Sequence, residues 1–142
     1  MTETLEFKQN GHLDPALSDP ATRTLNADKL TGRWLNTNPY TQGVAEIVIQ
    51  QEGAHFFVSV EGVGEDGPIA WPRTEAKALA NLEEEAGQRA LALVADFDFG
   101  FMKAETYLRV NKGVLVIVAY HTFLDGNQRS NYLNREFFYR KD

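Results

Sequence analysis

The chain contains no cysteine among its 142 residues. This absence excludes disulfides, thiolate catalysis and cysteine-based metal sites, and it removes any requirement for an oxidising compartment. No apolar run approaches the ~20 residues that a membrane-spanning helix requires. The polar start, Met1-Thr2-Glu3-Thr4, has neither the basic region nor the apolar stretch of a signal peptide. The sequence therefore predicts a cytoplasmic protein that does not insert in a membrane.

Basic residues are few, and they are scattered along the chain. Lys and Arg total 14 against 20 Asp and Glu, which gives a formal net charge of -6. Such a surface repels phosphate backbones and anionic lipids, so nucleic acid and membranes are not expected partners. The histidines, His12, His55 and His121, lack the spacing of a metal site. We expect no metal and no cofactor, and nothing in the sequence indicates an oligomeric state.

Proline is absent after Pro72, so every backbone amide in the second half of the chain can donate to a sheet. Residues 1–24 contain Asp14-Pro15 and Asp19-Pro20, which interrupt regular structure and predict a polar N-terminal arm. Residues 25–142 are predicted to form one domain. That domain opens with a helical turn, for which Asn26 is the expected N-cap.

What the chain does contain is a succession of apolar segments separated by Gly, Asn and Asp turns. They predict eight strands, at about 31–37, 43–51, 54–61, 69–80, 88–97, 101–110, 114–124 and 129–140. The short turns favour sequential antiparallel pairing, so we predict an all-β fold, an eight-stranded antiparallel up-and-down barrel. Helix formers between Glu75 and Glu85 leave a helical insertion as the alternative to a strand there.

The segment Thr31-Gly32-Arg33-Trp34, with strands following it, resembles the opening of lipocalins and of the wider calycin group, which includes the avidins. In that lipocalin-like arrangement the glycine lets the backbone pass beneath the indole, and the tryptophan plugs the narrow end of the barrel. An even number of antiparallel strands brings the last strand beside the first, so we expect Arg140 to stack on Trp34. The resemblance implies an interior that holds one small ligand.

Alternation along the strands divides the candidate site residues between two faces. In 101–110, either Met102, Ala104, Thr106, Leu108 and Val110 or Lys103, Glu105, Tyr107 and Arg109 face inward, and the period favours the apolar set. The segment 114–124 is apolar on both faces, so either Tyr120 or His121 points inward. On the last strand, Arg135 or Glu136 faces inward, where a buried charge needs a partner such as Glu105 or Arg109.

Two functions of different classes fit this arrangement. The first is a carrier or sequestering protein for a small, largely apolar organic molecule, with ligand contacts from Trp71, Phe57, Phe97, Arg109, Tyr132 and Arg135. The second is an isomerase, cyclase or dehydratase of specialised metabolism, with proton donors, acceptors or anchors at Tyr120, His121, Glu105 and Tyr107. A third class is an interaction module with a filled interior. The fold alone does not choose among them.

Overall fold

The structure is a computed structural model that describes residues 26–80, 89–126 and 129–142. These residues form nine strands: β1 (Gly32–Asn36), β2 (Val44–Glu52), β3 (His55–Gly64), β4 (Gly67–Ala70), β5 (Thr74–Ala80), β6 (Ala90–Asp98), β7 (Met102–Asn111), β8 (Val114–Phe123) and β9 (Tyr132–Lys141). The predicted arm at 1–24 and the second part of the alternative helical insertion, 81–85, lie outside the described residues. Within the described ranges, no helix has the length and apolar character needed to cross a membrane.

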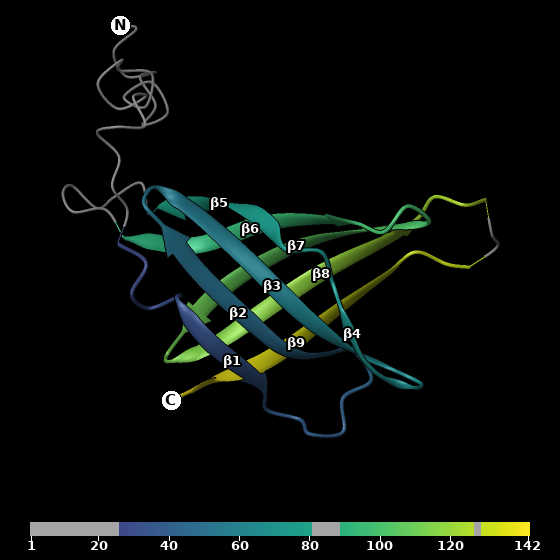
Figure 1. Ribbon diagram of the computed structural model, residues 1–142, viewed down its shortest axis with the longest axis horizontal. Coiled ribbons are helices and arrows are strands. Elements are labelled where there is room, and N and C mark those ends of the chain that lie inside the picture. The colour runs from purple at the N-terminus through teal and green to yellow at the C-terminus, as the bar shows by residue number, and fades with distance from the viewer. Residues whose placement is uncertain (1–25, 81–88, 127–128) are drawn as a thin grey trace, which may run out of the picture.

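Eight of these strands close into an antiparallel barrel, in which they run obliquely around the interior (Figure 1). The order β2-β1-β9-β8-β7-β6-β5-β3 returns to its start because β2 also pairs with β3. β9 completes the ring on β1, where Arg140 is the register partner of Trp34. The predicted eight-stranded antiparallel barrel is therefore confirmed. Closure gives every strand one inward and one outward face.

The single strand predicted over 69–80 is instead divided into β4 and β5. β4 pairs with the C-terminal part of β3, whereas β5 pairs with the N-terminal part of β3 and with β6. Pro72, between the two strands, has no amide proton for a ladder bond, and the Trp71 amide donates to the Val60 carbonyl at 2.9 Å. Residues 75–80 belong to β5, so the helical alternative is wrong for this part of the chain.

A turn before β1 covers one end of the barrel. Asn26 caps it, since its Oδ1 accepts from the Asp28 amide at 2.8 Å, and the Leu30 amide donates to the Ala27 carbonyl at 2.8 Å. Residues 28–30 form a single turn and not a longer helix. The Leu30 carbonyl in turn accepts from the indole Nε1 of Trp34 at 2.9 Å. The turn and the tryptophan thus hold each other in place.

Trp34 closes this end of the barrel. It is 1% exposed, and the Cζ atom of Arg140 lies 4.8 Å from the centroid of its ring. The guanidinium also donates to the Asp28 and Lys29 carbonyls, at 3.0 and 2.6 Å. The tryptophan plug and the stacked arginine expected from the resemblance are both present. The barrel is compatible with a lipocalin-like fold.

Inward-facing apolar side chains fill the barrel from Trp34 to its middle. The largest fully buried ones are Trp34, Phe97, Phe138, Leu30, Ile47, Ile49, Leu93, Leu108, Leu115, Ile117, Val44 and Val58. In β7 the apolar set is the inward one, as the period favoured, since Ala104 and Leu108 are buried whereas Glu105 and Arg109 are exposed. Unfilled space remains at the other end of the barrel.

The turn between β7 and β8 sets the orientation of β8. Lys112 and Gly113 both have positive φ, 53° and 81°, which is the conformation of a two-residue hairpin turn. With this turn Asn111 pairs with Val114, and His121 lies opposite Ala104. Because Ala104 faces inward, His121 also faces inward. Tyr120 therefore faces outward.

Candidate functional site

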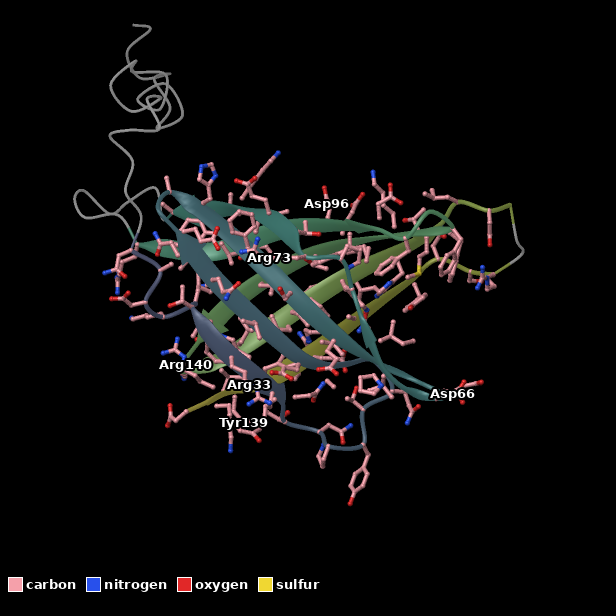
Figure 2. The ribbon with its side chains drawn as sticks, in the orientation of Figure 1. Arg33, Asp66, Arg73, Asp96, Tyr139 and Arg140 are labelled. Atoms are coloured by element: carbon pink, nitrogen blue, oxygen red, sulfur yellow. The ribbon has the colours of Figure 1, made fainter. Side chains whose placement is uncertain are left out.

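A pocket of about 390 Å³ lies at the end of the barrel opposite Trp34. Its lining comes from the β1–β2 loop, from the chain near β4, and from the ends of five barrel strands: Gln42, Gly43, Val44, Gly62, Val63, Ile69, Trp71, Met102, His121, Tyr132, Asn134 and Glu136. In Figure 2, Asp66 at the tip of the β3–β4 hairpin marks the end of the barrel with the pocket. Arg140, near the end of β9, marks the end closed by Trp34. Among the lining side chains, Val63, Ile69 and Tyr132 are also exposed, so the pocket opens to solvent. Its volume suits a small organic ligand.

Aromatic rings form one wall of the pocket. The Trp71 ring contacts Phe97 and Phe99 edge-on, with centroid distances of 5.1 and 5.2 Å, and meets His121 at 90° and 6.4 Å. Tyr132 stacks on His121 with a centroid distance of 4.2 Å and an interplanar angle of 10°. Such a wall offers dispersion and ring-edge contacts to a flat apolar group.

Two glycines make room for this wall and for the carboxylate beside it. A Cβ atom on Gly43 would come within 2.6 Å of Glu136 Oε2, and one on Gly62 would come within 3.0 Å of Trp71 Nε1. The first distance is too short for any real Cβ atom, and the second is tight. The absence of side chains at these positions therefore lets Glu136 and Trp71 pack closely against the backbone.

The Glu136 carboxylate is the centre of a polar network at the pocket. Its Oε1 contacts the Asn36 amide nitrogen, at 3.0 Å, and the Thr41 hydroxyl. Its Oε2 contacts the Val44 backbone amide, at 3.0 Å, and the Asn134 amide nitrogen, at 3.1 Å. The loop between β1 and β2 is thereby tied to β9. A charged acceptor with this number of neutral donors is well satisfied.

His121 continues the network toward β8. Its Nε2 lies 2.7 Å from the Asn134 side-chain oxygen. Its Nδ1 is buried and is the one such side-chain atom in the described residues that has no hydrogen-bond partner. A buried polar atom without a partner costs about 1–3 kcal/mol, so a hydrogen-bond partner from a ligand or solvent at this atom would stabilise the site.

Tyr132 contributes the phenol closest to His121. Its partial burial raises the pKa of the hydroxyl above its usual value. The phenol therefore stays protonated through the neutral range and can donate a hydrogen bond at the mouth of the pocket. No arginine or lysine is among the residues that line the pocket.

The structure brings together four of the ten residues that the sequence indicated. Trp71, His121 and Tyr132 line the pocket, and Phe97 is fully buried against Trp71. The other six lie on outward faces of their strands: Phe57, Glu105, Tyr107, Arg109, Tyr120 and Arg135.

Contacts on the outside of the barrel account for several of these six. The Cζ atom of Arg73 lies 3.9 Å from the ring centroid of Phe57, and that of Arg135 lies 5.4 Å from that of Phe137. Tyr120 is 50% exposed and is the register partner of Glu105. These cross-strand and same-face contacts are usual for the outer surface of a barrel.

Glu136, not Arg135, is the charge that faces inward on β9. The expected charged partners, Glu105 and Arg109, are on the outer face, and neutral donors satisfy the carboxylate instead. The sequence did hold a signal for this orientation. Since Arg140 stacks on Trp34, the residues two, four and six positions before it must share its face, and these include Asn134 and Glu136.

Neither a metal site nor a relative identifies the pocket. Among the described residues, no group of three His, Cys, Asp or Glu side chains is arranged to hold a metal ion. A scan against protein-family models and searches of curated proteins and of solved structures find no match for this chain. The chemistry of the pocket is therefore what indicates the function.

Proposed function

We propose that the protein binds a small, largely apolar organic molecule in the pocket at the open end of the barrel. The observation that carries this proposal is the aromatic wall of Trp71 and Tyr132 around a space of about 390 Å³. A wide apolar wall with a few polar groups is the usual composition of a small-molecule site. The ligand lies against Trp71, and its polar end faces the His121 side of the pocket.

The filled half of the barrel supports a ligand of limited size. Phe97 and Phe138 are fully buried below the pocket, so a long chain does not reach the Trp34 end without displacing core side chains. Entry is from solvent, past the exposed side chains of Val63 and Ile69. A compact aromatic molecule without a long chain fits these limits.

The neutral fluorescent probe N-phenyl-1-naphthylamine tests this proposal, because its emission increases in apolar sites. We expect saturable binding to the wild-type chain and at least about tenfold weaker binding to Trp71→Ala. The matched control is Phe57→Ala, which removes an aromatic ring from the outer face. Equal affinities for the two variants, or no binding to the wild type, would overturn the proposal.

A second candidate function, catalysis, is favoured by one observation. His121 is buried, is held through Asn134 to the Glu136 carboxylate, and retains an unpartnered nitrogen, as an oriented general base does. An isomerase, cyclase or dehydratase would use this imidazole and the Tyr132 phenol. This catalytic function does not involve Tyr120, Glu105 and Tyr107, because their side chains face away from the pocket.

Mass spectrometry of small molecules separates the two functions. The wild-type chain and His121→Ala are each incubated with an extract of the source cells. A carrier leaves all metabolites unchanged and retains a bound compound. An enzyme consumes a substrate, and His121→Ala lowers that rate by about 10²- to 10⁴-fold.

A further inference from the structure

The groups that contact the Glu136 carboxylate have fixed hydrogen-bond roles, and each of them donates to it. The Val44 amide nitrogen can only donate. Asn36 donates from Nδ2 to the Val44 carbonyl, at 2.7 Å, and its Oδ1 accepts from the Asn38 amide, so its orientation is fixed as well. The Thr41 hydroxyl oxygen accepts from the Gly43 amide at 3.0 Å and directs its proton to Glu136. The carboxylate is consequently an acceptor at both oxygens.

The carboxylate determines the orientation of Asn134. Its Nδ2 donates to Glu136 Oε2, because an amide oxygen in that position would face another acceptor. The Asn134 Oδ1 is therefore turned toward His121 and accepts a hydrogen bond. At 2.7 Å from this oxygen, His121 Nε2 must carry the proton. In the neutral imidazole the other nitrogen, Nδ1, then has a lone pair.

No donor in the hydrogen-bond network is paired with this lone pair on Nδ1. Nδ1 is buried, and no group of the described residues donates to it, while both oxygens of Glu136 already accept two hydrogen bonds each. The imidazole lines the pocket between the Trp71 and Tyr132 rings. A group that satisfies Nδ1 must supply an O–H or N–H proton.

We propose that the pocket selects molecules that carry a hydroxyl or N–H donor on an aromatic or aliphatic body, and that Nδ1 of His121 accepts the proton of this donor. The proposal rests on the proposed binding function and names its ligand class. Ethers lack the donor. Carboxylates lack it too, and they also meet the negative charge of Glu136, so neither class binds well.

Two probes of nearly equal shape test the selection: 2-naphthol, which donates, and 2-methoxynaphthalene, which only accepts. Equilibrium dialysis measures the affinity of each probe in the same buffer. We expect 2-naphthol to bind about tenfold more tightly to the wild-type chain, the ratio that one buried hydrogen bond supplies. His121→Phe should lower this ratio to about one, because it removes the acceptor and keeps a flat ring.

The matched control is His55→Phe, a histidine on the outer face of β3 that pairs with Glu75. It should keep the tenfold ratio. Equal binding of both probes to the wild type would overturn the selection by His121 and leave the proposed binding function standing. No binding of either probe would overturn the proposed function itself.

The tautomer of His121 is tested on the unmodified chain. Long-range proton–nitrogen NMR correlations distinguish a protonated ring nitrogen from one with a lone pair, and the spectrum of His121→Phe assigns the signals. We expect the proton on Nε2 in the free protein. A proton on Nδ1 would overturn the proposal whatever the dialysis shows. In Asn134→Leu, which removes the acceptor for Nε2–H, the wild-type preference for 2-naphthol should decrease.

Discussion

The two ends of the barrel contain similar aromatic residues but differ in how completely these residues are packed. At the closed end, Trp34 is 1% exposed, its indole N–H has an acceptor, and Arg140 covers its ring. At the open end, Trp71 and Tyr132 keep part of their surface accessible, and His121 has a buried nitrogen without a partner. The same ring types thus seal one end and leave the other unfilled. Incomplete packing lowers stability, and the proposed binding function accounts for this cost.

Trp34→Ala should have the largest effect of the changes that compare the two ends. Removing a fully buried tryptophan leaves a cavity that the neighbours cannot fill, and typically costs about 3–5 kcal/mol of the free energy of unfolding. Trp71→Ala should cost clearly less, because that ring is only partly buried. Urea unfolding of both variants gives the comparison. Equal losses would show that the open end is packed like the closed end.

Glu136→Leu tests whether the hydrogen-bond network at the open end stabilises the fold. The substitution leaves the donors of Asn36, Val44 and Asn134 without their shared acceptor, so we expect a loss of about 1–3 kcal/mol of unfolding free energy. Glu105→Leu is the control, since Glu105 is exposed on the outer face of β7, and its effect should stay within about 0.5 kcal/mol. If both variants unfold at the wild-type urea concentration, the network contributes nothing to the fold.

The closed end was predictable from sequence because barrel closure is a constraint on topology. Once eight antiparallel strands are counted, the last must lie beside the first, and Arg140 must approach Trp34. No detail of side-chain packing is needed for that step. The division of the segment 69–80 was less predictable, since it depends on the interruption of strand pairing with β3 around Trp71 and Pro72.

The open end was only partly predictable, for two physical reasons. Alternation does not orient β8, because its outer face is also apolar, and it does not choose between the charges of Arg135 and Glu136. In addition, part of the lining comes from the β1–β2 loop and from the chain near β4, which no strand pattern places. Stacking of Arg140 on Trp34 predicts which face of β9 points inward. It does not predict that the β1–β2 loop lines the pocket.

Gly43→Ala is a smaller and more specific change to the open end. The added methyl group would meet Glu136 Oε2 at 2.6 Å and displace the carboxylate from the Val44 amide, for a loss of about 1 kcal/mol. In the Glu136→Leu background the lost hydrogen bond is already absent. The two effects, measured by urea unfolding, should therefore be less than additive. Strict additivity would mean that Gly43 acts on the backbone alone.

The smallest expected effect is a pH dependence that comes from Tyr132. Burial raises the pKa of this phenol above its usual value, so the folded chain holds the proton more tightly than the unfolded chain. The resulting contribution to stability is fully present below the unfolded pKa of about 10 and is lost as the pH rises through the folded pKa. Tyr132→Phe should remove this alkaline loss.

Absorbance titration of phenolate provides the direct measurement. Tyr132→Phe should remove amplitude from the part of the curve above the usual pKa of tyrosine. Loss of amplitude in the usual range of tyrosine instead would show that solvent reaches the Tyr132 hydroxyl freely. The open end would then be wider than the stacked Tyr132 and His121 rings indicate. A donor ligand that occupies the pocket should shift the Tyr132 titration further upward, because it excludes water from the same hydroxyl.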